Sequence, residues 1–504
     1  MLSNKRTITF YFLVFLFLID KLWVWWYFTS LYTDDDQLVF LNIAKDLCNG
    51  IIRTPCFWGQ DYNLPIESWL AFPFIQAGMD IAAAVTLVST IIGIMPILIG
   101  AYFLFYKIDK LTASIWLAFF LLLPFEYSVL ITIPRGFTMG ILLVSVAMYS
   151  YFASPTIGYI KGISILFLTC LGMYLVPNSV LLVGFVGVYT FYYKLYSIDT
   201  KKIAISLVGV LPVVALVVGI KYYYRLHPSY TIHHASYGWE LASIVSNIKN
   251  ARNWFLGFAP FIYQAGSSVA VMGIGLLIYY YRQKSKMYNV LLLTSVAGFA
   301  LLISNKLTDG TASVLYGYNR FFMAIPLIVY ALISNLELWK NKMASTTLIT
   351  IAVAFTGYKI VSIPSSIQKV IHDNSGIVDI VKLDNLHTDI VTITDYCKQQ
   401  DIQWIVLGEC NTTPLNYAID YWNIPAIHTI YPCYERRHWI REKANTVKNQ
   451  KLLLIDVPNK PEYTYVKNWQ SIALHKSFSM HTYTLKNTTL ADFCVPIHSN
   501  YKKH

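Results

Sequence analysis

Charged residues are scarce in this sequence, and their scarcity excludes an ordinary soluble protein. Asp, Glu, Lys and Arg make up only 13% of the 504 residues, whereas soluble domains usually carry about 25%. Hydrophobic residues account for 56% and aromatic residues for 16%. This balance predicts an integral membrane protein, with a lipid bilayer as its surroundings.

The short motifs of nucleotide, zinc and redox chemistry are also missing. The C-terminal part contains neither a Gly-x-Gly-x-x-Gly fingerprint nor a P-loop, so nucleotide binding is not expected there. None of the seven cysteines belongs to a Cys-x-x-Cys pair, and we expect no cofactor. Cys48 and Cys56 share one segment and four cysteines share the C-terminal tail, so disulfides in an oxidising compartment and free structural thiols are both open.

Long apolar runs, by contrast, are abundant. The first extends from about Ile8 to Leu31, and a bilayer needs only about 20 residues. It is too long for a cleaved signal sequence, so we interpret it as a retained span. Ten more spans are predicted at about 81–106, 111–124, 136–153, 160–176, 178–195, 202–220, 267–281, 288–304, 320–337 and 345–361. The expected fold class is an α-helical polytopic membrane protein with about eleven transmembrane helices.

Basic residues orient these spans. With Lys5 and Arg6 in the cytoplasm, every second connection is basic, as the positive-inside rule requires. The segments at about 32–80, 124–135, 222–266 and 305–319 are then outside, as is the tail from about 362. Orientation explains most of the net charge of +12, so no nucleic-acid partner is expected.

The tail has a different character. Short apolar runs predict strands at 389–393, 404–408, 451–456 and 472–475, and helices at 394–400 and 416–422. This alternation predicts a small α/β domain with a partly parallel sheet. We therefore expect a transmembrane domain, 1–361, and an extracytoplasmic α/β domain, 362–504, which recognises an acceptor, covers the active site or only adds stability.

Three consecutive aspartates, Asp34, Asp35 and Asp36, follow the first span. Clustered carboxylates repel one another, and membrane insertion does not need them, so their position favours a chemical role. A carboxylate can accept the proton of an attacking hydroxyl group. A solvated surface run is the alternative, and Asp34-x-Asp36 also resembles the metal-binding motif of nucleotide-sugar enzymes on soluble folds. We favour a site without a metal ion.

The segment around the triplet resembles the start of GT-C glycosyltransferases, polytopic enzymes that take sugars from polyprenyl-phosphate donors. An acidic pair, an Ile-Ala step and a glycine stand at the usual spacing, as Asp35-Asp36, Ile43-Ala44 and Gly50. Residues 59–70, which begin Gly-Gln-Asp-Tyr and contain Glu67, are similar to a segment of the bacterial members that leads into the second span. Weaker matches are 124–126, 134–137, 172–178 and 318–326.

The resemblance implies roles for individual residues. Asp35 is the expected general base, with Asp36 or Asp34 as second choice. Glu67 and Glu126 are candidates for contacts to sugar or acceptor. Arg135 and Arg320 are candidates for the donor phosphate, because a guanidinium binds phosphate through two hydrogen bonds. The alternative for both arginines is a side chain that reaches toward the membrane interface.

The architecture also resembles phage-type serotype-converting O-antigen glucosyltransferases. This implies transfer of glucose from undecaprenyl phosphate to lipopolysaccharide O-antigen in the periplasm, by a protein of the bacterial inner membrane whose partners include a donor synthase and a flippase. Lipid A, cell-wall polymers and proteins are alternative acceptors.

Other classes of protein compete with this interpretation. A transporter or flippase for lipid-linked saccharides would show repeat symmetry and charged residues inside spans, and neither is clear in the sequence. An O-antigen polymerase, a non-catalytic subunit and a receptor are further alternatives.

Overall fold

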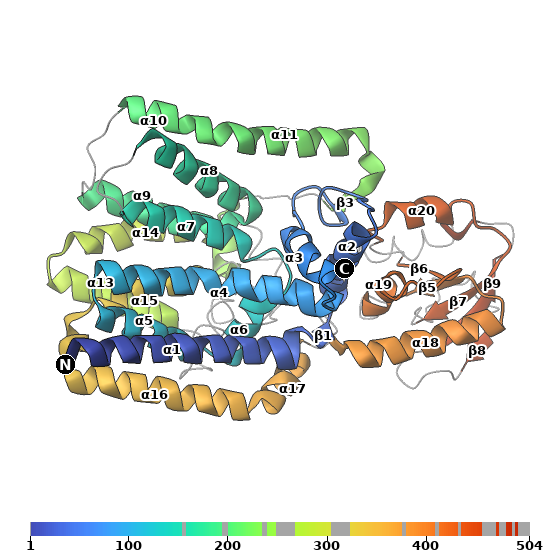
Figure 1. The fold of residues 1–504 in the computed structure, drawn as a ribbon. Coiled ribbons are helices and arrows are strands. Elements are labelled where there is room, and N and C mark those ends of the chain that lie inside the picture. Colours follow the sequence, from blue (N-terminus) through green and yellow to red (C-terminus); the bar gives the residue numbers. More distant parts are fainter. Residues whose placement is uncertain are drawn as a thin grey trace. The chain divides into compact units, whose positions relative to one another are not determined.

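The computed structural model describes residues 2–153, 158–193, 200–233, 239–247, 268–303, 323–374, 380–408, 413–431, 435–455, 470–472, 480–485 and 489–491. The chain forms two compact units (Figure 1). Unit 1 comprises Met1–Thr29, Thr86–Val218 and Ser236–Asp373, and unit 2 comprises Ser30–Val85, Gly219–Ala235 and Asn374–His504.

Helices make up the described part of unit 1, and each of the predicted spans overlaps one of them. They are α1 (Leu2–Val24), which continues as the π-helix η1 (Trp25–Thr29), α4 (Ile81–Lys107), α5 (Lys110–Leu121), α6 (Phe125–Thr132), α7 (Met139–Ala153), α8 (Tyr159–Leu175), α9 (Val180–Tyr193), α10 (Thr200–Ser206), α11 (Leu211–Leu226), α13 (Ser268–Arg282), α14 (Lys286–Leu302), α15 (Ile325–Ser334), α16 (Lys342–Val361) and α17 (Ile363–Asn374). Residues 81–85 of α4 and residues 219–226 of α11, which are the second half of that helix, belong to unit 2.

Length distinguishes these helices. Within the described residues, four are long and apolar enough to cross a membrane: Lys5–Thr29, Ile81–Lys107, Ile203–Leu226 and Lys342–Val361. The span predicted at 111–124 is instead a pair of helices, α5 and α6, bent by 95° at a short break. Other apolar helices are shorter, so the number of spans stays a prediction.

One face of α1 contributes to the core of unit 1. Phe10, Leu13 and Phe17 recur three and four residues apart, and they belong to a buried apolar cluster with residues of α5 and α15. Ile8 and Phe15 are instead 64% and 60% exposed. A helix that is apolar on its exposed face as well is suited to a lipid environment.

Charged side chains do lie inside the helices of unit 1. Asp20 accepts from Lys21 at 2.7 Å and from Lys359 of α16 at 2.9 Å, and all three residues are buried. Lys21 also donates to Ser128 of α6 at 2.5 Å, and Lys359 donates to the Leu123 carbonyl at 3.2 Å. The view that charges are not evident within the spans is therefore wrong, and these charges connect α1, α16 and the bend between α5 and α6.

Unit 2 combines the segment after α1 with the tail. Its elements are β1 (Tyr32–Thr33), α2 (Asp35–Cys48), β2 (Gly59–Gln60), α3 (Ile66–Gln76), β3 (Thr231–His233), β4 (Val381–Lys382), α18 (Leu383–Gln399), β5 (Trp404–Leu407), α19 (Thr413–Tyr421), β6 (His428–Ile430), α20 (His438–Ala444), β7 (Lys451–Ile455), β8 (Gln470–Ile472) and β9 (Met480–Thr484). Five strands form one sheet in the order β6-β5-β7-β9-β8. β5 is parallel to β6 and β7, whereas β9 is antiparallel to β7 and β8, so the sheet is partly parallel.

Among the described residues, one element of the tail contradicts its prediction. The strand predicted at 389–393 is wrong, because these residues lie in α18. Leu386, Ile390, Ile393 and Cys397 are buried at intervals of three and four residues, which is the pattern of a helix packed on one face. The strands predicted at 404–408 and 451–456 correspond to β5 and β7, and the helix predicted at 416–422 corresponds to α19. The strand predicted at 472–475 reaches the described residues only at Ile472, the last residue of β8, and 473–475 lie outside them.

Helix α2 is fastened to α19 by two side chains. Asn42 donates to the Tyr417 carbonyl at 3.0 Å. Lys45 donates to the carbonyls of Asp420 and Tyr421 at 2.6 and 2.7 Å, and a cation is favourable at this carboxyl end of a helix. β1 also pairs with β4. The first predicted outside segment and the tail therefore fold together, while the location of the tail outside the cytoplasm stays a prediction.

The cysteines of unit 2 that the structure describes are thiols. Cys48, Cys56 and Cys397 are free, so Cys48 and Cys56 do not form the disulfide that their shared segment allowed. Burial raises the pKa of the Cys56 thiol to about 12, which makes it unreactive at neutral pH. Cys410, Cys433 and Cys494 lie outside the described residues.

Candidate functional site

The acidic triplet stands at the amino end of α2, and its first member caps that helix. The Asp34 carboxylate accepts from the Gln37 backbone N–H at 3.0 Å and from the Gln37 side-chain amide at 2.5 Å. Asp34 is fully buried. An aspartate in this position satisfies an N–H group that has no partner within the helix. Asp34 thus fixes the start of α2, and Asp35 and Asp36 are the first two residues of that helix.

Asp35 and Asp36 share one cation from the tail. Arg436 Nη1 lies 2.6 Å from Asp36 Oδ1, and Arg436 Nη2 lies 3.5 Å from Asp35 Oδ2. The side chains of Asp35 and Asp36 are 18% and 31% exposed, compared with 8% for Arg436. A guanidinium and a helix amino terminus both attract carboxylate groups. Both carboxylates are partly accessible, so a ligand can reach them and donate hydrogen bonds to them.

Close packing holds Arg436 in this position. Gly59 adopts a φ of +76°, and a Cβ at this glycine would lie 3.1 Å from Arg436 Cβ and 3.0 Å from Ile232 Cγ1. The guanidinium lies 5.1 Å from the centre of the Phe57 ring. Gly59 begins the second segment that resembles the GT-C pattern. The structure explains why a glycine is needed at this position: without a side chain there, the tail can approach the first outside segment closely.

The neighbouring Arg437 anchors the same part of the tail. It is fully buried and donates to Glu435, Asp420 and the Asn416 side chain, each at 2.7 Å. A buried guanidinium with this many partners fixes the backbone on either side of it. Arg437 is therefore a structural residue, while Arg436 faces the carboxylates.

The other predicted site residues fall in both units. Glu67 is buried in the first turn of α3 in unit 2. In unit 1, Glu126 of α6 forms an ion pair with Lys369 of α17 at 3.0 Å, and Arg135 is buried between α6 and α7. Arg320 lies outside the described residues. The structure thus groups the triplet with Glu67 in unit 2, and the ligand contacts proposed for these side chains stay predictions.

Sequence reasoning missed Arg436. Its signal was the run Glu435-Arg436-Arg437, three consecutive charged residues in the middle of the tail. A charge run of this kind in an α/β domain is usually solvated surface, yet all three residues are buried.

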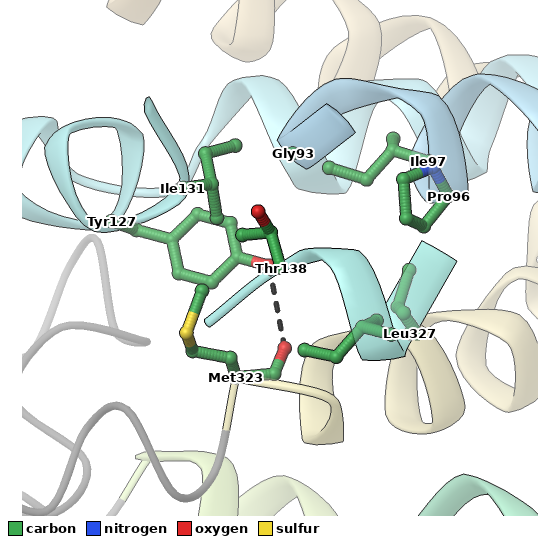
Figure 2. Close-up of a pocket in the computed structure, with 9 residues that line it drawn as sticks. Gly93, Pro96, Ile97, Tyr127, Ile131, Thr138, Met323 and Leu327 are labelled. Carbon is green, nitrogen blue, oxygen red and sulfur yellow. Dashed lines mark hydrogen bonds between the residues drawn. The ribbon is translucent and has the colours of Figure 1, made fainter. Parts of the chain in front are cut away.

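Each unit contains a hollow of its own. In unit 1 the hollow measures only about 10 Å³ and is lined mainly by apolar groups, including Ile97, Ile131 and Leu327 (Figure 2). Tyr127 donates to the Met323 carbonyl there at 3.5 Å. This is room for about one water molecule. In unit 2 the hollow measures about 320 Å³ and is lined by tryptophans, carboxylates and basic groups, and that volume suits a small ligand.

Metal ligands do not gather in the part of the chain that the structure describes. No group of three or more His, Cys, Asp or Glu side chains lies close enough there to hold an ion. In unit 2 the carboxylates of Asp35 and Asp36 form ion pairs with the guanidinium of Arg436.

Comparison with known proteins identifies the fold. No family model and no curated protein matches this sequence. The structure is similar to ArnT from Cupriavidus metallidurans in the apo state, with a TM-score of 0.57 and 10% identity over 93% of this chain and 97% of ArnT. It is also similar to ArnT bound to undecaprenyl phosphate, with a TM-score of 0.54 and the same identity and coverage. ArnT has the GT-C polytopic membrane fold, so the predicted α-helical, GT-C-like polytopic fold is confirmed. The number of transmembrane helices and the extracytoplasmic location of the α/β domain stay predictions.

Proposed function

We propose that this chain, a multi-pass membrane protein with the GT-C fold, transfers a sugar from a polyprenyl-phosphate donor to an extracytoplasmic acceptor glycan. One observation carries the proposal: two accessible carboxylates at the amino end of α2 are held by Arg436, in a protein that shares its fold with ArnT. The ArnT structure bound to undecaprenyl phosphate supports a lipid-phosphate donor.

The proposed reaction is a single displacement. Asp35 accepts the proton of an acceptor hydroxyl group while the hydroxyl oxygen attacks the anomeric carbon of the donor sugar. The bond from that carbon to the phosphate oxygen breaks, and polyprenyl phosphate leaves with the bonding electrons. Attack from the opposite side inverts the anomeric centre.

Asp35 is the preferred base because of its contacts. Its oxygen lies 3.5 Å from Arg436, whereas Asp36 approaches the same guanidinium to 2.6 Å. The shorter contact indicates that Asp36 binds Arg436 more strongly than Asp35 does. The Asp34 carboxylate already accepts the hydrogen bond that caps the helix. Asp36 would then keep Arg436 in place, and Asp35 would take the proton.

The leaving phosphate needs positive charge. Arg135 and Arg320 are proposed for this role, because charge-assisted hydrogen bonds from guanidinium groups stabilise the charge that develops on phosphate oxygen. Glu67 and Glu126 are proposed to contact sugar or acceptor. These four roles rest on the sequence resemblance.

For the sugar, the acceptor and the location, we propose glucose, the O-antigen of lipopolysaccharide, and the bacterial inner membrane with a cytoplasmic N-terminus and a periplasmic tail. A donor synthase and a flippase would supply the substrate. Mass spectrometry of surface glycans from cells with and without the gene tests this. A mass difference of one hexose per repeat is expected, and identical glycans would contradict the proposed acceptor.

A flippase for lipid-linked saccharides is the second candidate. The buried charges of Asp20, Lys21 and Lys359 inside helices favour it, because ionisable residues within spans are typical of transport pathways. Proteoliposomes loaded with a polyprenyl-phosphate sugar separate the two functions. An enzyme releases free polyprenyl phosphate, whereas a flippase leaves the donor intact.

A further inference from the structure

The hollow of unit 2 lies at the other end of α2 from the triplet. Its walls come from the end of α2 and the segment after it, with Asp46, Arg53 and Trp58, and from the tail, with Asp420, His428 and Trp439. Its volume of about 320 Å³ lies in the range of small-molecule sites. We call it the tryptophan hollow.

Two indole rings of the tryptophan hollow are held rigidly. The rings of Trp58 and Trp439 meet edge to face, with centroids 4.9 Å apart and an angle of 87°. Arg53 lies over the Trp439 ring at 4.1 Å, and Trp58 is only 2% exposed. Trp58 therefore supports the half-buried ring of Trp439, and a ring fixed in this way offers an apolar surface that loses little conformational freedom when a ligand binds.

The carboxylates of the hollow are each balanced by a guanidinium. Asp46 accepts from Arg53 at 2.6 Å, and Asp420 accepts from Arg437 at 2.7 Å. A carboxylate has about four acceptor sites, so each can also accept hydrogen bonds from ligand hydroxyl groups. Burial and the nearby Lys443 lower the pKa of His428, which favours its neutral ring. Paired charges and a neutral imidazole suit an uncharged ligand with many hydroxyl groups.

Strained backbone borders the hollow on the side of the tail. Asn423 and Ala426 both line it, and they adopt φ values of +51° and +63°. Asparagine tolerates this left-handed region, but alanine does not favour it. Such strain collects at binding sites, where the surrounding structure holds it in place.

We propose that the tryptophan hollow binds one neutral pyranose unit of the acceptor glycan, an inference that rests on the proposed function. The apolar C–H face of the sugar packs on an indole, and its hydroxyl groups donate to Asp46 and Asp420. Asp46 lies ten residues beyond Asp36 in α2, a distance of about 15 Å along the helix axis. The bound unit is therefore remote from the hydroxyl group that reacts, so the hollow selects a polymer or oligosaccharide over a single sugar.

The test is saturation-transfer NMR on the purified full-length protein in nanodiscs. The probes are the methyl pyranosides of glucose, galactose, mannose, rhamnose and N-acetylglucosamine, with inorganic phosphate as the charged probe. We expect saturation of at least one glycoside, and binding that is about tenfold weaker in Trp439→Ala. Trp439→Phe, which keeps an aromatic ring, should retain most of the binding.

Trp422→Ala is the matched control, because the Trp422 ring packs against His387, with ring centroids 4.9 Å apart, and does not line the hollow. Its glycoside binding should equal that of the wild type. The inference is overturned if no glycoside is saturated, if Trp439→Ala binds as well as wild type, or if phosphate displaces the sugar. Thermal unfolding of each variant shows whether a loss reflects misfolding. If Trp439→Ala does not fold, Trp439→Leu decides the matter, because leucine fills part of the space without an aromatic ring and should lose the binding that Trp439→Phe keeps.

Donor turnover separates this inference from the proposed function. If wild-type protein releases polyprenyl phosphate from its donor but glycosides do not bind at Trp439, only the hollow is assigned wrongly. If glycosides bind there and the donor is never turned over, the site stands and the transferase function fails.

Discussion

Each unit contains a cluster of charged side chains, but the two clusters differ in how far they are exposed to solvent. In unit 1, Asp20, Lys21 and Lys359 are almost completely buried, and two ammonium groups share one carboxylate. In unit 2, Asp35 and Asp36 keep 18% and 31% of their side-chain surface exposed while they contact Arg436. The first arrangement suits a permanent connection between helices, and the second suits a site that substrate can enter.

The largest effect is expected where the enclosed cluster of unit 1 is broken. Asp20→Ala leaves two buried ammonium groups without their carboxylate, which should destabilise the protein by about 3–5 kcal/mol. Thermal unfolding in detergent, monitored by size-exclusion chromatography, measures the loss. Glu337→Gln is the control, because the Glu337–Lys340 pair is exposed and contributes little. An Asp20→Ala protein of normal stability that no longer moves lipid-linked sugar would instead favour the flippase.

Gly59 tests how tightly the cluster of unit 2 is positioned. Gly59→Ala places a Cβ 3.0 Å from Ile232 and 3.1 Å from Arg436, in addition to the strain of a positive φ, so we expect a cost of about 2 kcal/mol. Gly50→Ala is the matched control, because Gly50 has a φ of +72° and open space around the added Cβ. Gly59→Ala should be the less stable of the two and should lose more sugar transfer. Equal stability and activity would show that Arg436 does not depend on this approach.

Most helices could be predicted from the sequence because long apolar runs have few other solutions. The charges within α1 were overlooked because a hydropathy window tolerates one or two polar residues, and Asp20 and Lys21 are surrounded by aromatic side chains in sequence. The strand predicted at 389–393 failed because β-branched residues dominate that run, while the helical spacing extends over α18 as a whole.

The candidate site was only half predictable. The local sequence pattern predicted Asp34, Asp35 and Asp36 as site residues. Arg436, which pairs with Asp36, lies 400 residues further along the chain. No local pattern encodes such a contact, which depends on the docking of α19 against α2 and on the absence of a side chain at Gly59.

The smallest predicted effect is a pH dependence of the stability of unit 2, and it comes from His438. Burial lowers the pKa of His438 from the usual 6.5 to about 4, and its ring stacks on Tyr230. As the pH falls below about 6.5, the unfolded chain takes up a proton that the folded protein accepts only near pH 4, so stability decreases across this window. We expect a loss of about 1–2 kcal/mol, reduced by solvent screening.

His438→Phe keeps a stacked ring but has no titrating group. The unfolding midpoints of both proteins between pH 7 and pH 4.5 test the assignment. The wild type should lose more stability than His438→Phe over this range, and parallel curves would contradict it.

The central claim is that a carboxylate at the start of α2 acts as the base in sugar transfer. Release of polyprenyl phosphate by Asp35→Asn protein in proteoliposomes tests it most directly, with Asp34→Asn as the matched control, because asparagine caps a helix as well as aspartate does. We predict that Asp35→Asn folds normally and loses at least a hundredfold in rate, while Asp34→Asn loses less than tenfold. Full activity in both Asp35→Asn and Asp36→Asn would contradict the account.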